Sequence, residues 1–238
     1  SRYVDAALLV GADGARSVVR KLAKIGVSEY DYEQVGIVAK LDAELPHQDI
    51  AWQRFLADGP VGVLPLANNQ VSIVWSCPLA QVNELMDIPA NEFCAILSDR
   101  LEHRLGQLQL ASTRQTFPLR SQTAQRYFNQ NMVLLGDAAH SIHPLAGQGA
   151  NLGFKDADCL SQHLNADDGT RLVKRLAEYE RIRRRDNQMT DQAMTFLNAA
   201  FRTNTPLWSA ARGLGMNWIS SSANIKSVLA KQAMGLTS

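Results

Sequence analysis

The sequence has few cysteines, almost no net charge and no long apolar run. Its three cysteines, Cys77, Cys94 and Cys159, are far apart and odd in number, which argues against a disulfide framework or a zinc cluster. The formal charge of +1 gives no case for binding nucleic acid. No apolar run reaches the roughly 18 residues that a bilayer requires, so we expect neither a membrane span nor a signal peptide. A reducing cytoplasm is the expected compartment.

The remaining composition is typical of a soluble globular chain. With 238 residues, 46% hydrophobic and 20% charged, the sequence is long enough for a large core and one or two domains. It contains no Gly-x-Ser-x-Gly elbow that would support a hydrolase. The chain starts at Ser1 rather than at a methionine and already close to an expected strand, so we expect that further sequence precedes it.

The most informative stretch covers residues 132–151. Four apolar residues, 132–135, predict a short buried strand, and Asp137 follows at its carboxyl end, where open α/β sheets bind their ligands. Pro144 would end any helix begun at Ala138. A second helix is expected from about residues 147–149 to Leu164, with glycines where a ligand approaches backbone N–H groups. The stretch predicts a site for a polyol and an anion.

An earlier stretch, residues 6–20, has a related pattern. An apolar strand at residues 6–10 runs into a Gly/Asp/Gly turn, and a helix with Ser17 and Arg20 follows. In one interpretation Asp13 only caps this helix. In the other, Asp13 and Arg20 face a phosphate-bearing cofactor across the strand end. The motif by itself leaves both interpretations open.

Between these stretches the pattern changes to short β-prone runs separated by turn residues. Strands are expected at residues 35–41, 51–56, 62–66 and 71–77, which together predict an antiparallel meander. An amphipathic helix at residues 91–105 should face a core, and a strand at 112–119 should lead back. The order predicts an antiparallel domain inserted into another domain.

The chain beyond Leu164 is expected to be helical until Thr203–Pro206. The arginine-rich run at residues 181–185 favours a solvated helix face, with a partner or phospholipid surface as the alternative. The tail, residues 207–235, mixes aromatic, aliphatic and basic residues, which suits either a small helical cap or a membrane-surface helix. Asp137, His140 and His143 resemble metal ligands, but no second ligand cluster is visible, so we expect no metal site.

Together the two motifs resemble those of a known family. Residues 11–17 with Arg20, and residues 136–140 with Pro144 and 147–153, resemble the paired Asp-Gly and Gly-Asp motifs of FAD-dependent aromatic hydroxylases in order and separation. Within this family the sequence is most similar to the ubiquinone-biosynthesis hydroxylases, which oxidise polyprenylated phenols. Residues 117–119, 143–149 and 231–236 carry this narrower likeness, which runs over essentially the whole chain.

The resemblance implies a mixed fold, α+β or α/β. Residues 1–30 and 128–200 would form the carboxy-terminal part of an FAD-binding domain, residues 31–127 an inserted antiparallel-sheet substrate domain, and residues 201–238 a helical cap. The implied activity is hydroxylation of an aromatic ring with FAD, NAD(P)H and O₂. The implied small-molecule partner is a prenylated aromatic substrate. Peripheral contact with the inner face of a membrane, and binding to a second copy or to other ubiquinone-biosynthesis proteins, are also implied. No nucleic acid is expected as a partner.

The resemblance also implies roles for individual residues. Asp137 would bind ribityl or ribose hydroxyls of FAD. The Asp-Gly motif would lie near the pyrophosphate and the path of NAD(P)H. Backbone N–H groups of the loop after the Gly-Asp motif, residues 144–151, would stabilise negative charge on the reduced flavin. No residue has to act as a base, because a phenol is already activated, so His140 and His143 are only candidate catalytic residues. The implied cofactor-binding residues are Asp13, Arg20, Gly136, Asp137, Pro144, Gly147, Gln148, Gly149, Ala150 and Asn151.

The sequence departs from the family in one respect. The Gly-x-Gly-x-x-Gly turn that holds the ADP half of FAD, and the acidic residue about 20 positions beyond it, are absent. We therefore expect the chain to be the carboxy-terminal part of a longer enzyme. Two hypotheses remain open: a piece of a flavin monooxygenase, or a non-catalytic binding or assembly module that keeps the fold.

Overall fold

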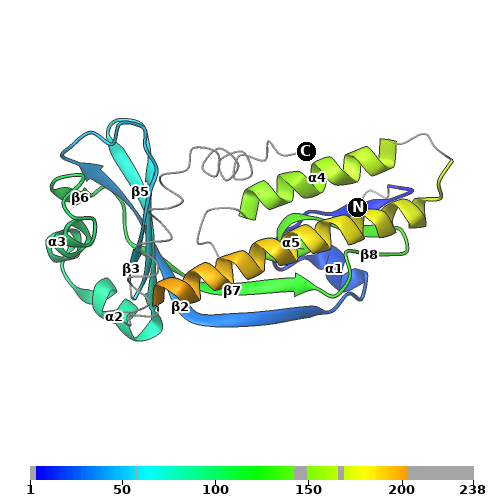
Figure 1. The fold of residues 1–238 in the computed structure, drawn as a ribbon, viewed down its shortest axis with the longest axis horizontal. Helices are drawn as coiled ribbons and strands as arrows, with labels where there is room; N and C mark the ends of the chain where they lie inside the picture. Colours follow the sequence, from blue (N-terminus) through cyan, green and yellow to red (C-terminus); the bar gives the residue numbers. More distant parts are fainter. Residues whose placement is uncertain (1–3, 57, 142–148, 166–168, 203–238) are drawn as a thin grey trace. The chain divides into compact units, whose positions relative to one another are not determined.

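The computed structural model describes residues 4–56, 58–141, 149–165 and 169–202 (Figure 1). By their internal contacts the described residues form two units. The first contains residues 4–30 and Ser121–Leu197, and the second contains Asp31–Arg120 with Asn198–Arg202. Both divisions fall inside long strands, β2 (Val27–Ala43) and β7 (Gln115–Ala124).

The first unit is built on a three-stranded sheet. Its strand order is β1 (Leu9–Gly11), β9 (Met132–Leu134) and β8 (Phe128–Asn129), with β1 parallel to β9 and β8 antiparallel to it. Strand β10 (His140–Ser141) pairs with β7. The helices of this unit are α1 (Val18–Leu22), the 3₁₀ turn η1 (Gly136–Ala138), α4 (Gly149–Asn165) and most of α5 (Leu172–Arg202).

The core of the first unit lies among β9, α4 and α5. Apolar side chains from all three elements are buried there, including Val133, Leu160 and Leu176. Tyr179 of α5 is fully buried among them, and its hydroxyl donates a 2.8 Å hydrogen bond to the Leu134 carbonyl at the end of β9. Helix α5 therefore fixes the strand end from which the Gly-Asp motif begins.

The second unit is an antiparallel sheet with two helices. Strands β2, β5 (Gln70–Pro78), β4 (Gly59–Pro65) and β3 (Trp52–Leu56) follow one another in the sheet, and β6 (Leu108–Leu110) pairs with β2. Alternate residues of the strands pack against α2 (Leu79–Asp87) and α3 (Ala90–Arg100), as the two-residue period of a strand requires. Trp75, at the centre of β5, is fully buried 5.9 Å from the Phe93 ring.

The mixed fold class is confirmed. Strands β3, β4 and β5 form an antiparallel meander as expected, but β2 pairs with β5 rather than with β3. Other elements also depart from expectation. Strand β2 begins at Val27, eight residues earlier than expected, because residues 27–34 are mostly exposed and polar and show no apolar alternation. Helix α2 was not expected. Helix α3 ends at Arg100, where Glu102 and His103 have positive φ angles of 54° and 53°, although Leu101 and Leu105 remain buried. After η1 the chain forms strand β10 rather than a helix from Ala138.

Candidate functional site

The two motifs singled out in the sequence meet at one edge of the first unit. Strands β1 and β9 are parallel, with Gly11 opposite Leu134, so Asp13 and Asp137 both follow the carboxyl ends of neighbouring strands. The carboxyl edge of parallel strands is where such sheets bind ligands. More than a hundred residues separate the two motifs in the sequence, and the parallel pairing brings them together.

Asp137 lies in η1, just past β9, and is exposed. Its carboxylate has no hydrogen bond or ion pair to any residue that the structure describes. Gly136, the preceding residue, has a φ angle of +56°, which favours glycine. Asp137 therefore presents a charged hydrogen-bond acceptor to the outside of the strand end.

The first turn of α4 is the second exposed feature. Ala150 and Asn151 are exposed, and a Cβ atom placed on Gly149 would meet nothing within 4 Å. The first N–H groups of a helix have no partner within the helix, so such a turn can accept an anion or another acceptor. Four residues of the implied site, His143, Pro144, Gly147 and Gln148, lie outside the residues that the structure describes.

The Asp-Gly motif is tied into the structure by its own side chains. Asp13 accepts hydrogen bonds from the Ser17 hydroxyl and from the backbone N–H groups of Val18 (2.6 Å) and Val19 (3.2 Å). The hydrogen bond from Ser17 is the main cause that lowers the pKa of the Asp13 carboxyl. Asp13 therefore caps α1, and its contact with a cofactor phosphate stays a prediction.

Arg20 connects the two motifs. It is buried, and its guanidinium donates to the Ala15 carbonyl (2.7 Å) in the first motif and to the Ala138 carbonyl (2.8 Å) in η1. A guanidinium offers several donors in a fixed plane, which suits the bridging of two carbonyls. Arg20 therefore holds η1 against the turn before α1, and its direct contact with FAD stays a prediction.

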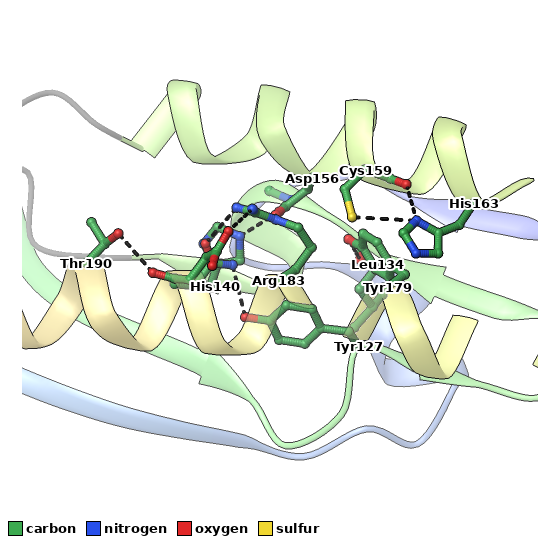
Figure 2. Close-up of polar contacts among 12 residues, drawn as sticks. Tyr127, Leu134, His140, Asp156, Cys159, His163, Tyr179, Arg183 and Thr190 are labelled. Carbon is green, nitrogen blue, oxygen red and sulfur yellow. Dashed lines mark hydrogen bonds and ion pairs between the residues drawn. The ribbon is translucent and has the colours of Figure 1, made fainter. Parts of the chain in front are cut away.

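A buried charged cluster lies beneath the Gly-Asp motif (Figure 2). Asp156 of α4 has no exposed surface, and its Oδ2 accepts from the Gly136 N–H (2.8 Å) and contacts His140 Nε2 at 2.6 Å. Its Oδ1 accepts from Arg183 Nε of α5 at 2.7 Å. Burial raises the pKa of the Asp156 carboxyl, but the hydrogen bond and charge of His140, with the hydrogen bonds from Arg183 and Gly136, outweigh it and hold the pKa below its usual value.

The cluster continues along α5 to the core. Arg183 also donates to Asp186 (2.8 Å) and to the Asn187 side chain (3.1 Å), and Asn187 donates to the Tyr127 hydroxyl (3.2 Å). The Tyr127 ring stacks on His140 with 5.9 Å between centroids (Figure 2). Burial raises the pKa of Tyr127 to about 12, so this hydroxyl stays protonated near neutral pH.

Sequence reasoning missed most of this cluster. It interpreted residues 181–185 as a solvated face, which is wrong for Arg183: only 3% of this residue is exposed, whereas Arg181 and Arg185 are exposed. The helical spacing indicates that Arg183 is buried, because Leu176, Tyr179 and Arg183 are three and four residues apart and share one face of α5. Asp156 follows Gly149 by seven residues, about two helical turns, and carried no signal of its own.

Comparisons with known proteins decide the family. A family model described as an FAD binding domain matches residues 1–193. The chain belongs to this family. The chain is 37% identical to ubiquinone hydroxylase UbiL of Rhodospirillum rubrum over 98% of its length and 55% of that protein. It is 35% identical to 3-demethoxyubiquinol 3-hydroxylase of Escherichia coli, over 98% of its own length and 60% of the relative.

Solved structures agree with this membership. Anhydrotetracycline hydroxylase OxyS of Streptomyces rimosus is 25% identical and superposes with a TM-score of 0.68 over 97% of this chain and 46% of that protein. The p-nitrophenol 4-monooxygenase PnpA of Pseudomonas putida, at 19% identity and a TM-score of 0.72, supports the fold alone. The resemblance drawn from the two motifs is confirmed. The chain spans little more than half the length of the two curated relatives.

The exposed features of the site fit FAD. The carboxylate of Asp137, which has no partner among the described residues, suits the hydroxyls of a ribityl or ribose group, and a Cβ atom on Gly149, beside the N–H groups of the first turn of α4, would meet no described atom within 4 Å. Within the described ranges, no three His, Cys, Asp or Glu side chains gather as a metal site would need. None of the helices described is both long and apolar enough to cross a bilayer.

Proposed function

We propose that this chain is the carboxy-terminal part of a flavoprotein monooxygenase that hydroxylates an aromatic ring. The observation that carries the proposal is the exposed carboxylate of Asp137 at the carboxyl end of β9, which has no partner among the described residues. The preceding residue, Gly136, is held in place by a hydrogen bond to Asp156 of α4. Membership of the FAD-binding family supports FAD as the group it meets.

In this proposal the residues of the chain bind and orient the cofactor. Asp137 accepts hydrogen bonds from FAD hydroxyls. The first turn of α4, Gly149–Asn151, and the preceding Gly147 and Gln148 offer N–H groups to the flavin, whereas Pro144, which has no N–H, contacts the flavin ring. FAD, when bound, supplies the redox and oxygen chemistry that amino-acid side chains lack. Asp13 and Arg20 support the neighbouring strand end, and their contact with the pyrophosphate remains a proposal.

The finer details of the reaction are also proposals. The names of the two curated relatives, a ubiquinone hydroxylase and a 3-demethoxyubiquinol 3-hydroxylase, favour a polyprenylated phenol in ubiquinone biosynthesis as the substrate. NAD(P)H is proposed as the reductant and O₂ as the oxidant. The antiparallel-sheet domain, predicted at residues 31–127, is proposed to carry the substrate side of the enzyme.

Replacement of Asp137 tests the cofactor assignment. In the intact flavoprotein we expect Asp137→Ala to weaken FAD binding by about 1.5–3 kcal/mol, the usual range for a hydrogen bond to a charged group. This equals roughly 10- to 150-fold in affinity, measured by titrating the apoprotein with FAD and following flavin fluorescence.

A matched control comes from α4. Asp158 is exposed, and among the residues that the structure describes its carboxylate accepts a hydrogen bond only from Gln162, at 2.9 Å, so Asp158→Ala removes an acid away from the strand end. We expect this variant to bind FAD as the parent does. Equal FAD affinity for Asp137→Ala and the parent would contradict the proposal that Asp137 contacts FAD. An intact protein that binds no FAD at all would favour a non-catalytic module instead.

Membrane and subunit contacts are further proposals. The tail, residues 207–235, lies outside the residues that the structure describes. Its aromatic and basic composition favours a peripheral contact with the inner face of a membrane, where a prenylated substrate would partition. Liposome binding that is unchanged after deletion of residues 207–238 would argue against this contact. Sedimentation of the intact protein would test a homo-oligomer.

A further inference from the structure

We propose that Asp156, His140 and Arg183 are positioning residues, which hold Asp137 and the first turn of α4 in the geometry that receives FAD. The inference rests on the proposed function, because it assigns these residues a purpose at the same site. It also gives His140 a positioning role in place of a catalytic one, because this side chain is buried and its Nε2 contacts Asp156 at 2.6 Å.

The first step of the argument is the contact with Gly136. The Gly136 N–H donates to Asp156 Oδ2 at 2.8 Å, and the next residue in the chain is Asp137. Asp156 itself lies in α4, about two turns beyond Gly149. One carboxylate therefore connects the backbone that carries Asp137 with the helix whose first turn is the other proposed FAD contact.

The second step is the close approach of the same two elements. Gly136 faces Gly153 of α4 so closely that a Cβ atom on Gly153 would lie 3.4 Å from the Gly136 Cα. Gly136 also has a φ angle of +56°, which a hydrogen bond to its N–H helps to fix. The backbone before Asp137 is therefore held by both packing and a charged acceptor.

The third step concerns Asp156 itself. A carboxylate with no exposed surface is stable only when donors surround it, and Asp156 has three: Gly136 N–H, His140 and Arg183. Arg183 is anchored in turn by Asp186 and Asn187 of α5. The arrangement connects η1, β10, α4 and α5 through one buried ion.

A double-mutant cycle tests whether these residues act through Asp137. In the intact flavoprotein, Asp156→Asn keeps the shape of the side chain but turns one carboxylate oxygen into an NH₂ group. This group cannot accept the hydrogen bond from either Gly136 N–H or Arg183, whichever it faces. We expect this variant to bind FAD about tenfold more weakly than the parent. In a protein that already carries Asp137→Asn, we expect the same change to weaken FAD binding clearly less than tenfold, because only its effect through the first turn of α4 remains.

Two controls separate positioning from general loss of stability. Asp158→Asn changes an exposed carboxylate of the same helix and should leave FAD affinity unchanged. Arg183→Lys keeps the charge but removes the planar fork that contacts Asp156, Asp186 and Asn187, so it should reproduce the effect of Asp156→Asn in weaker form. If Asp156→Asn does not fold, the cycle is run with Arg183→Lys and with His140→Asn.

The outcomes are distinct. If Asp137→Asn leaves FAD binding unchanged, the proposed cofactor contact fails, and this inference fails with it. If Asp137→Asn weakens FAD binding but the cluster variants do not, or if the two effects simply add, the proposed function stands and the positioning role is overturned. An effect of the cluster variants on FAD affinity that is clearly smaller in the Asp137→Asn background than in the parent supports the inference.

Discussion

At the scale of single residues, Gly149 offers a clean test of the helix turn that we propose contacts FAD. A Cβ atom at this position would meet no atom within 4 Å among the residues that the structure describes. We expect Gly149→Val to weaken FAD binding by roughly 10- to 150-fold, the equivalent of one lost hydrogen bond to a charged group. Flavin content after gel filtration and FAD titration measure the effect.

The matched control for this variant is Ala157→Val, which places the same branched side chain at an exposed position of α4. Ala157→Val lowers helix propensity whereas Gly149→Val does not, so a loss of FAD affinity confined to Gly149→Val points to a contact with the cofactor rather than to a weaker helix. Equal FAD affinity for the two variants would show that the first turn of α4 does not touch the flavin.

Some residue roles could be predicted from the sequence and others could not. A helix cap at Asp13 follows from local spacing, because the carboxylate and the N–H groups it accepts lie within six residues. The bridge from Arg20 to Ala138 spans 118 residues, so no local pattern contains it. Arg183 was misinterpreted because an arginine is usually exposed, and only its partner Asp156 explains its burial.

At the scale of elements, the charge of Asp156 should make the contact between α4 and η1 sensitive to acid. The pKa of Asp156 in the folded protein is held below the usual value. Its charge therefore stabilises the folded state fully at any pH above the unfolded pKa, about 3.9. This contribution is lost as the pH falls from about 3.9 toward the lower pKa of the folded state. At pH 7 we expect Asp156→Asn to lower the free energy of unfolding by about 1.5–3 kcal/mol.

The stability difference between the parent and Asp156→Asn should therefore shrink as the pH falls below about 4, where Asp156 becomes protonated in the unfolded parent, until the folded parent is protonated as well. Thermal unfolding followed by circular dichroism at several pH values measures this difference. Asp158→Asn, whose carboxylate is exposed, should track the parent throughout. A difference that stays constant down to acid pH would show that ionisation of Asp156 does not stabilise the fold.

The elements themselves could be predicted where periodicity is strong. The strands β3, β4 and β5 lie close to the expected ranges, because alternate residues such as Val71, Ile73 and Trp75 face one core. Helix α4 begins at Gly149, within the range expected from its glycines. Strand β10 has two residues and its pairing partner, β7, is distant in sequence, so no local signal distinguishes it.

At the scale of the molecule, the sequence predicted that one unit is formed by residues before and after an antiparallel sheet, because a run of β-prone segments separates the two related motifs. The parallel pairing of β1 with β9 brings the two motifs together, and Arg20, which follows β1, donates to the Ala138 carbonyl next to Asp137. The buried cluster was not predictable at this scale, since it depends on the packing of α4 and α5 against the strand end.

The last prediction concerns the 238-residue chain by itself, which we expect not to hydroxylate a substrate. The FAD contacts proposed here, at Asp137 and at the first turn of α4, contribute about 1.5–3 kcal/mol each at best. Association costs an estimated 4–15 kcal/mol, so we expect FAD to bind in the micromolar to millimolar range. Strand β1 lies at the edge of its three-stranded sheet with Leu9 43% and Val10 40% exposed, which favours self-association.

The test is to purify the chain, add FAD with NADH or NADPH, and follow flavin fluorescence and oxygen uptake with a simple phenol. We expect a colourless, partly self-associated protein that takes up flavin only when it is joined to the ADP-binding half proposed to precede it. The joined protein is the positive control, because it contains the same Asp137 and α4. A stoichiometric yellow complex of the chain alone, with oxygen uptake that depends on the phenol, would contradict the prediction and show that the contacts at β9 and α4 suffice for FAD.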